Sequence, residues 1–506
     1  MTKLKKIYIR QIGFSQTGPF GSQLHEEDYV SMGTPIVTVE HLGGYKFTTQ
    51  NLPFVRDDDK NRLSKYILEE GDIVFSRVGS IDRCTYVSKD EAGWLFSGRC
   101  LRVRINKEKA NPKFVSYYFR QSFFKRMMLN ISVGATMPSL NTKLMDNVHL
   151  FLPNEKQQQR IASVLSSLDD KIELNNRINT ELGTMAKTLY DYWFVQFDFP
   201  DNNGKPYKSS GGKMVYSKEL KRKIPEVWNV GKIADWILSV KNGDWGKEQE
   251  EGNYILKVSC IRGADINGLN NNGELNPPER YILEKNSAKI LTPHDVIIEI
   301  SGGSPTQSTG RMAYLTQETL SRFENPLICS NFCKTISLRN EKYLYNFAFL
   351  WNMLYDNGVF FGYEGKTSGI KNFLFDSFVN SYCSVIPRED IVSKFYDFMQ
   401  DIEKKKQKLL TENQQLASLR DWLLPMLMNG QIGFKEEYQE QAQTFNVAAE
   451  AAVEYKKTET PTTHVPQEQD ERFELWLSSQ GLAARGDIDR PTLREIFNVM
   501  DEEEYG

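Results

Sequence analysis

Asp72–Ser80 reads DIVFSRVGS, and Asp295–Ser304 reads DVIIEISGGS. Each is a short run of apolar and β-branched residues that begins at an aspartate and ends at glycine and serine, a pattern typical of a buried strand followed by a turn. The two runs lie about 220 residues apart, a spacing that is too long for a solenoid repeat and fits a duplicated domain.

Three further pairs of segments recur in the same order along the chain. They are Gly33–Leu42 (GTPIVTVEHL) with Gly252–Ile261 (GNYILKVSCI), Phe96–Ile105 (FSGRCLRVRI) with Ile328–Leu338 (ICSNFCKTISL), and Thr136–Pro153 with Thr367–Pro387. Helical patterns interrupt the strands of each copy, at Pro112–Met128 and Tyr343–Tyr355. The sequence therefore predicts two mixed α/β domains related by duplication.

A long helix is predicted after each copy, because residues recur every seven positions with polar flanks. The positions are Ile161, Leu168, Asn175, Leu182 and Leu189 in the first helix, and Phe395, Ile402, Leu409, Leu416 and Leu423 in the second. This period is typical of a coiled coil, and Asn175 places a polar side chain in the stripe, where a buried amide favours one register. Each helix of about 37 residues spans roughly 55 Å. The alternative is that each helix packs only on its own domain as an ordinary amphipathic helix.

Proline positions suggest where the two long helices begin and end. Pro153 and Pro387 precede the two helices, and Pro425 is expected to end the second. We expect an α+β fold of two mixed α/β domains whose long helices pair in a two-helix coiled coil. The predicted parts are residues 1–153 (first domain), 154–200 (first helix and the region after it), 201–387 (linker and second domain), 388–433 (second helix) and 434–506 (acidic tether and small helical tail).

Charge is unevenly distributed along the chain. Residues 434–506 carry 7 Lys and Arg against 17 Asp and Glu, which leaves residues 1–433 with a net charge of +7 although the whole chain has −3. A mildly basic body permits contact with phosphates. Residues 205–223 hold seven basic residues and one acidic residue around a Gly-Gly pair, and we expect a flexible basic connector there. Short helices are expected at residues 473–477 and 493–500.

Residue types that often form catalytic or metal sites are scattered along this sequence. The six cysteines form no paired motif, which fits a reducing cytosol and small buried side chains, although Cys329 and Cys333 have the spacing to share a helix face. The five histidines are not grouped, and the phosphate-loop motif GxxxxGK[ST] does not occur. No apolar run reaches the roughly 18 residues that a membrane span needs. We therefore expect no catalytic centre, no metal site and no membrane contact.

Several motifs together resemble the specificity subunits of type I restriction-modification enzymes. The motifs are GPFGSQL (Gly18–Leu24), PNEKQQQRIASVLSSLDDKIELNN (Pro153–Asn176), LYDYWFVQFDFPDNNGKPY (Leu189–Tyr207), IPEVWNVGKI (Ile224–Ile233) and LLTENQQLASLRDWLLPMLMNGQI (Leu409–Ile432). The resemblance covers residues 1–433 and is most specific in the helices.

The resemblance implies a particular arrangement and set of partners. Two target recognition domains would lie at opposite ends of a long antiparallel two-helix spacer, and each would read one half of a split, asymmetric sequence in double-stranded DNA. Two adenine methyltransferase subunits that use S-adenosylmethionine would dock on the helices, and two restriction subunits, which act as motor and nuclease with ATP and Mg²⁺, would join them. The chain itself would hold no cofactor and catalyse nothing.

The residue types that read DNA occur in loops at matching places of the two copies. Bases are read by Arg, Lys, Asn and Gln, and phosphates by Ser, Thr and Lys in glycine-rich turns. The candidates in the first domain are Ser22, Gln23, Arg77, Ser80, Arg83, Thr136, Ser139 and Asn141, and those in the second are Lys241, Trp245, Ser304, Thr306, Gln307, Lys366, Thr367 and Lys371.

Two motifs imitate catalytic sites. Asn276-Pro277-Pro278-Glu279 resembles a methyltransferase motif but lacks the aromatic residue that stacks on a flipped base, and we expect a turn. Glu364-Gly365-Lys366 resembles a nuclease metal motif, and its glycine-rich surroundings suggest a loop. Two other functions stay open: a solitary methyltransferase or nuclease with its own recognition domains, and a coiled-coil scaffold that binds only protein.

Overall fold

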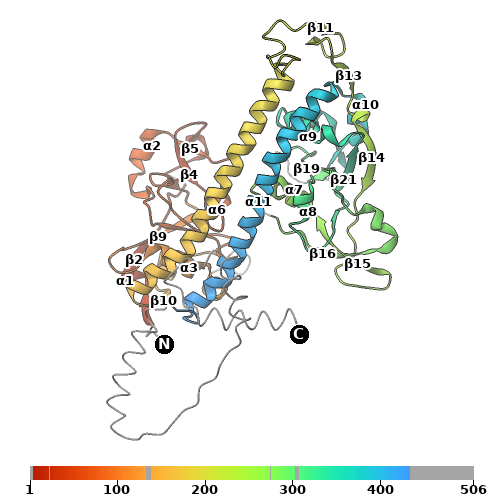
Figure 1. Cartoon of the computed structure of the whole chain (residues 1–506). Helices are drawn as coiled ribbons and strands as arrows, with labels where there is room; N and C mark the ends of the chain where they lie inside the picture. The colour runs from red at the N-terminus through yellow and green to blue at the C-terminus, as the bar shows by residue number, and fades with distance from the viewer. Residues whose placement is uncertain are drawn as a thin grey trace, which may run out of the picture. The chain divides into compact units, whose positions relative to one another are not determined.

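The computed structural model describes residues 4–21, 23–132, 138–273, 275–302, 307–367 and 370–433 (Figure 1). The chain divides into two compact units. Unit 1 is Met1–Asp169 with Ala417–Gly506, and unit 2 is Asp170–Leu416. Each unit therefore contains one mixed α/β domain together with a section of both long helices. The helices expected at residues 473–477 and 493–500 lie outside the described residues.

The domain of unit 1 is built on a four-stranded antiparallel sheet. Its order is β2 (Gly13–Thr17), β9 (Cys100–Ile105), β6 (Ile73–Ser76) and β7 (Cys84–Tyr86). A second sheet has the order β3 (Tyr29–Val30), β5 (Phe54–Val55), β4 (Thr34–Val37) and β8 (Leu95–Phe96), with β4 and β8 parallel. β1 (Lys5–Tyr8) pairs with β10 (His149–Leu152). The helices are α1 (Ile9–Ile12), α2 (Asp57–Arg62), α3 (Pro112–Arg120), α4 (Ser122–Ile131) and α5 (Thr142–Asp146).

The domain of unit 2 repeats the main sheet, the parallel strand pair and the outer strand pair of unit 1, but its described residues contain no counterpart of β3. Its four-stranded sheet has the order β14 (Ile237–Asn242), β21 (Cys333–Leu338), β17 (Val296–Glu299) and β19 (Met312–Tyr314). A second sheet joins β16 (Glu279–Leu283), β15 (Tyr254–Ile261) and β20 (Leu327–Cys329), with β15 and β20 parallel. β13 (Asn229–Lys232) pairs with β24 (Cys383–Ile386). The helices are α7 (Ile266–Asn270), α8 (Gln317–Leu320), α9 (Leu344–Asp356) and α10 (Phe375–Ser381).

The predicted duplication and the α+β class are thus confirmed. The repeated DIVFS and DVIIE runs are β6 and β17, and the FSGRC and ICSNFC segments lead into β9 and β21. A small sheet formed by β18 (Ser301–Gly302), β23 (Ile370–Phe373) and β22 (Glu364–Thr367) stands beside the repeated one and has no counterpart among the described residues of unit 1.

The two long helices are α6 (Glu155–Tyr190, 36 residues) and α11 (Glu389–Met428, 40 residues), which lie side by side (Figure 1). Within unit 2 they run antiparallel, because Lys171 Nζ lies 3.3 Å from Glu412 Oε1 and the Tyr190 ring lies 6.1 Å from that of Phe395. Of the heptad residues, Ile161, Asn175, Phe395, Ile402 and Leu423 are buried, and Leu168, Leu182, Leu189, Leu409 and Leu416 are half-buried.

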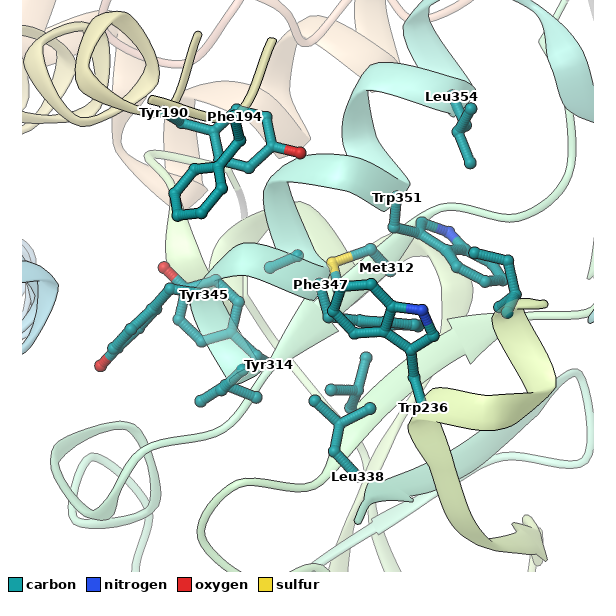
Figure 2. Packing of buried hydrophobic residues seen from close by; sticks show 14 of the residues in the cluster. Tyr190, Phe194, Trp236, Met312, Tyr314, Leu338, Tyr345, Phe347, Trp351 and Leu354 are labelled. Atoms are coloured by element: carbon teal, nitrogen blue, oxygen red, sulfur yellow. The ribbon is translucent and has the colours of Figure 1, made fainter. Parts of the chain in front are cut away.

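Each helix also packs on the α/β domains, so the stripe faces more than its partner helix. In unit 1, Ile161 and Leu423 share an apolar cluster with Phe75 and Val103 of the sheet. In unit 2, Phe395 lies in a large cluster with Trp236 and Trp351, and Figure 2 shows Tyr190 and Phe194 among its members. Helix pairing and helix-on-domain packing therefore coexist.

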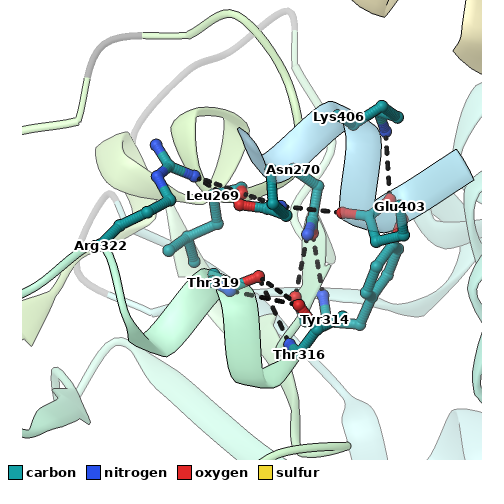
Figure 3. A network of polar contacts seen from close by, with 9 residues as sticks. Leu269, Asn270, Tyr314, Thr316, Thr319, Arg322, Glu403 and Lys406 are labelled. Atoms are coloured by element: carbon teal, nitrogen blue, oxygen red, sulfur yellow. Dashed lines mark hydrogen bonds and ion pairs between the residues drawn. The ribbon is translucent and has the colours of Figure 1, made fainter. Parts of the chain in front are cut away.

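A buried polar network adds to the contact between α11 and the domain of unit 2 (Figure 3). The Glu403 carboxylate is 1% exposed and accepts hydrogen bonds from Tyr314 Oη and Gln407 Nε2, each at 2.8 Å. Gln407 Nε2 also donates to the Leu269 carbonyl at 3.0 Å, and Arg322 Nη1 donates to the same carbonyl at 2.9 Å. Burial lowers the pKa of Arg322 to about 10. Such fully bonded networks favour one docking geometry over others.

Four local expectations were wrong. Pro425 lies inside α11, which continues to Met428: the proline removes one N–H hydrogen bond, but buried Leu424 and Leu427 hold the last turn in the apolar core of unit 1. Residues 205–223 are an ordered connector that contains β11 (Met214–Ser217) and leads to β12 (Arg222–Pro225), its antiparallel partner.

The other two errors concern residues with suggestive spacing. Cys329 ends β20 and Cys333 begins β21, so they flank a turn and do not share a helix. Glu364-Gly365-Lys366 lies in strand β22 and not in a loop. Asn276-Pro277-Pro278 does lie outside helices and strands, as expected, and Glu279 begins β16.

Candidate nucleic-acid interface

Four loops of unit 1 meet at one end of its main sheet. They are Gly18–Gly21 after β2, Arg77–Arg83 after β6, Ser97–Arg99 before β9, and residues 138–141. Backbone hydrogen bonds join them: Gly18 N to Cys100 O at 3.2 Å, Arg77 N to Arg99 O at 2.8 Å, and Leu140 N to Arg77 O at 2.8 Å. The loops therefore form one continuous surface whose shape is fixed by the strands that carry them.

Arg77 holds this surface together. Its Nη1 donates to Gly98 O at 3.2 Å, its Nε donates to Leu140 O at 3.3 Å, and its Cζ lies 4.8 Å from the centre of the Phe20 ring. A half-buried guanidinium with these three contacts positions the loops around it. Phe20 is 50% exposed and covers the arginine from outside.

Other candidates in unit 1 also have structural partners. Gln23 Oε1 accepts a hydrogen bond from Tyr66 Oη at 2.7 Å, and Asn141 Oδ1 accepts one from Leu144 N at 2.8 Å, where it caps α5. Ser139 forms a β-bridge with Val78. Ser80 and Arg83 are exposed on the loop after β6. Ser22 and Thr136 lie outside the described residues.

Unit 2 brings the equivalent loops together at the same end of its sheet. They are Gly243–Gly246 after β14, Ile300–Gly302 after β17, and Ser330–Phe332 before β21. One joining hydrogen bond matches unit 1, from Ile300 N to Phe332 O at 2.8 Å, and a second one, from Asp244 N to Cys329 O at 2.8 Å, ties the first loop to the end of β20. The small sheet β18–β23–β22 extends this surface in unit 2 only.

The candidates of unit 2 fall into exposed and buried groups. Trp245 is 36% exposed, and Arg280 lies beneath it with Cζ 4.5 Å from the ring centre. Lys241 Nζ is 3.8 Å from Asp295 Oδ2 and is about 30% exposed. Lys371 is largely buried, where its Nζ lies 3.2 Å from Glu364 Oε2 and donates to Gln307 O at 3.4 Å.

Glu364 is the anion of this buried pair. Burial alone would raise the pKa of its carboxyl group, but the Thr309 N–H at 2.8 Å and the Lys371 ammonium lower that pKa below its ordinary value. The Lys371–Glu364 ion pair therefore joins β23 to β22 within the small sheet. Lys366 and Thr367 are in β22, and Ser304 and Thr306 lie outside the described residues.

Sequence reasoning missed a motif that the two loops share. Gly18-Pro19-Phe20-Gly21 and Gly243-Asp244-Trp245-Gly246 both read Gly-x-aromatic-Gly directly after equivalent strands. In each, the exposed aromatic ring covers an arginine from another segment, Arg77 or Arg280. The common spacing from β2 and β14 was the available signal, but Phe20 and Arg280 were not among the candidates.

The repeated aspartates Asp72 and Asp295 anchor both sheets in the same way. Asp72 Oδ2 accepts from Glu69 N at 2.8 Å, and Asp295 Oδ2 accepts from Thr292 N at 2.9 Å. Asp72 also binds Arg104 Nε at 2.7 Å, and Asp295 accepts from Ser337 Oγ at 2.7 Å. Both carboxylates are about 98–99% buried, so their role is to fix the strand that carries the loop.

Other kinds of site are not found in the part of the chain that the structure describes. No group of three or more His, Cys, Asp or Glu side chains in them is arranged to hold a metal ion. Among the helices that the structure describes, none has both the length and the apolar character to cross a membrane.

Comparison with known proteins gives a consistent result. The sequence profile of the type I restriction modification DNA specificity domain matches residues 16–184. The type I restriction enzyme MjaIX specificity subunit of Methanocaldococcus jannaschii is 24% identical over 433 residues, which cover 81% of this chain and 89% of that protein. The HindI specificity subunit of Haemophilus influenzae is 29% identical over 140 residues, or 27% and 30% of the two chains.

Among solved structures, the S subunit of a type-I restriction-modification system from M. genitalium superimposes with a TM-score of 0.48 and 15% identity, covering 84% of this chain and 96% of its own.

Proposed function

Because the chain belongs to the family of type I restriction-modification specificity subunits, we propose that it reads a bipartite, asymmetric sequence in double-stranded DNA and directs partner subunits to it. Specificity subunits of this family are non-catalytic parts of multi-subunit enzymes. The partners in the proposal are two adenine-N6 methyltransferase subunits and two restriction subunits. S-adenosylmethionine, ATP and Mg²⁺ belong to those partners.

The observation that carries the proposal is the repetition of one loop surface with different side chains. The same three loops stand at the same end of the same four-stranded sheet in both units. Where unit 1 has Phe20 and Arg77, unit 2 has Trp245 and Ile300. A repeated scaffold suits two half-sites of one duplex, and different side chains on it suit two different half-site sequences.

The exposure of each predicted residue divides the candidates into those that we propose contact DNA and those that support the loops. We propose that Ser80 and Arg83 of unit 1 and Lys241 and Trp245 of unit 2 contact DNA directly. Arg77, Gln23, Asn141 and Lys371 hold the loops in place, since each has the partners described above. The helices α6 and α11 would carry the methyltransferase subunits and would set the number of unread base pairs between the half-sites.

The decisive experiment is a methylation map. Co-expression of the chain with its methyltransferase partner should mark adenines in one two-part motif, whereas the chain alone with DNA, S-adenosylmethionine and Mg²⁺ should mark none. Methylation by the chain alone would instead establish a solitary methyltransferase. A protein-only scaffold would show no preference for any sequence over random DNA in gel shifts at increasing salt.

The spacer role has its own test. A seven-residue insertion in each long helix, after Asp169 and after Leu416, lengthens the pair by about 10 Å, which corresponds to about three base pairs at 3.4 Å each. The methylated motif should gain about that number of unread positions while both half-site sequences stay the same. An unchanged spacing would contradict the spacer role.

A further inference from the structure

We propose that Arg99 and Phe332 occupy equivalent base-reading positions at the tips of two matching turns, one in each unit. The turns are Ser97–Cys100 and Ser330–Cys333, named here the tip turns. Arg99 would donate to the acceptor edge of a guanine, and Phe332 would make an apolar contact with a thymine methyl group. The inference rests on the proposed function, which supplies DNA as the ligand.

The two tip turns have the same internal geometry. In each, the cysteine N–H donates to the serine carbonyl at 2.9 Å. The serine hydroxyl lies 3.6 Å from the Cys100 sulfur in unit 1 and 3.9 Å from the Cys333 sulfur in unit 2. All four of these side chains are buried, whereas Arg99 of the first turn and Asn331 and Phe332 of the second are exposed. The turn thus has a fixed base and a free tip.

Neighbouring loops clamp both turns at the same two points. A Cβ on Gly18 would stand 2.1 Å from the Ser97 carbonyl oxygen, and a Cβ on Gly243 would stand 2.0 Å from that of Ser330. Only glycine permits this approach. On the other side, the carbonyl oxygen of the tip residue accepts a backbone N–H at 2.8 Å, from Arg77 in unit 1 and from Ile300 in unit 2.

The tip side chains are the part that differs. Arg99 is exposed, and within the described residues its side chain has no hydrogen-bond or ion-pair partner. Phe332 is 53% exposed. A tip held by backbone contacts alone accepts any side chain without a change in fold, and a pre-ordered backbone reduces the entropy lost on binding. This combination fits a position that determines specificity.

The aromatic loops lie directly against the tip turns and complete each surface. Gly18 and Gly243, which press on the turns, begin the loops that carry Phe20 and Trp245. Each exposed ring is backed by an arginine, so its position is set before DNA arrives. Each unit therefore presents one exposed aromatic ring, Phe20 or Trp245, beside a turn whose tip residue differs between the units.

The test is selection of methylated targets by the complete complex from a DNA library randomised across both half-sites. Arg99→Ala should relax the preference at one base pair of one half-site by about 5- to 150-fold and leave the other half-site unchanged, in line with the loss of one bidentate base contact. Phe332→Ala should relax one position of the opposite half-site. Arg56→Ala and Ile255→Ala are matched controls at exposed positions away from the turns, and they should leave both half-sites unchanged.

A conservative variant separates base reading from phosphate contact. Lysine keeps the charge of Arg99 but cannot make the paired contact, so Arg99→Lys should keep overall affinity and lose the base preference. Uniform weakening of all sequences by Arg99→Ala, with full preference retained by Arg99→Lys, would overturn the inference. So would unchanged half-sites in both alanine variants of a wild-type complex that reads a two-part target. Failure of the wild-type complex to read such a target would overturn the proposed function itself.

Discussion

Arg420→Met tests how the end of α11 is held in unit 1. The Arg420 guanidinium is 7% exposed and lies 2.8 Å from Asp169 Oδ1 of α6 and 2.9 Å from Asp421 Oδ1. Its Cζ also stands 3.4 Å from the centre of the Tyr45 ring. The hydroxyl of Tyr117 donates a hydrogen bond to Asp169 as well. Arg420 thus joins α11 to α6 and to the loop that carries Tyr45, and Asp169 extends the contact to Tyr117 of α3.

The loss of unfolding free energy caused by Arg420→Met depends on the charge that stays buried after the substitution. Removal of one partner from a buried ion pair costs about 3–5 kcal/mol, because the other charge stays buried. Methionine keeps much of the buried stem, and Asp169 keeps Tyr117 as a donor, so we expect about 3 kcal/mol. Asp169→Asn should cost only about 1 kcal/mol, since Arg420 then still pairs with Asp421 and the amide oxygen still accepts from Tyr117.

Thiol labelling can measure the loss of stability separately in unit 1 and unit 2. Cys84 and Cys100 are buried in unit 1, while Cys260, Cys329 and Cys333 are buried in unit 2. With an alkylating reagent and peptide mass spectrometry, Arg420→Met should speed labelling of Cys84 and Cys100 by about 100-fold, the factor that about 3 kcal/mol gives. The labelling of the three unit 2 thiols should stay within about threefold of wild type.

Lys171→Met is the matched control. Lys171 and Glu412 also join α6 to α11, at 3.3 Å, but both side chains are more than a third exposed. This substitution should cost less than about 1 kcal/mol. The reasoning fails if Arg420→Met costs no more than Lys171→Met, or if Asp169→Asn is the more harmful of the two changes at the buried pair.

Three other predictions follow. Asn175→Ala and Asn413→Ala should show a coupling of about 0.5–2 kcal/mol in a double-mutant cycle, because Asn175 Nδ2 donates to Asn413 Oδ1 at 3.0 Å across the helix pair; additive effects would exclude a polar contact that fixes register. Trp351→Phe should cost about 1–3 kcal/mol of unfolding free energy in urea, since the indole N–H donates to Gly310 O at 2.7 Å, and Trp351→Ala should cost more. Burial raises the pKa of Cys84 and Cys329 to about 11 and of Cys100 to about 12, from about 9. Because these thiols ionise earlier in the unfolded chain, stability should be full below pH 9 and should fall as the pH rises toward 11; a urea midpoint that is unchanged between pH 8 and 10.5 would contradict this linkage.

The repeat was predictable because strand chemistry is local. Apolar runs such as Ile73–Ser76 and Val296–Glu299 are bounded by aspartate and glycine, so they indicate buried strands wherever they stand. The order in which the strands pair is set by contacts between distant segments, and no local pattern encodes it. The helices were predictable for the same reason as the strands, since the seven-residue period lies within each segment.

The polar contacts of the helices escaped prediction. Glu403 and Gln407 look like solvent-facing residues of an amphipathic helix, yet both are buried against α7 and β19 of unit 2. Periodicity places charged and polar residues on the exposed face of a helix. It does not reveal that the Tyr314 hydroxyl binds Glu403 or that the Leu269 carbonyl binds Gln407. Pro425 was misread in a similar way, because the rule that proline ends a helix ignores the buried leucines that hold the last turn.

The candidate site was predicted from residue type, which does not reveal what a side chain contacts in the fold. Residue type suggested Arg77 and Lys371 as DNA contacts, and this stays a prediction; in the fold, backbone carbonyls accept from Arg77 Nε and Nη1, and Glu364 pairs with Lys371. Conversely, Arg99 and Phe332 stand at matching places of the paired FSGRC and ICSNFC segments, but their side chains differ so much in chemistry that residue type did not suggest a shared role; the matching backbone hydrogen bonds of the two turns do.

The internal repeat separates the work of the scaffold from the work of recognition. Features that are the same in both units, such as Asp72 with Asp295 and Gly18 with Gly243, fix the strands and press the loops together. A change at these positions should therefore lower stability and weaken DNA binding together. Features that differ, such as Arg99 against Phe332, stand on exposed tips with free side chains. A change there should alter which sequence is read while the domain keeps most of its stability, because the turn is held by backbone hydrogen bonds that do not depend on the tip side chain. New target specificities are accordingly most accessible by substitution at the tips.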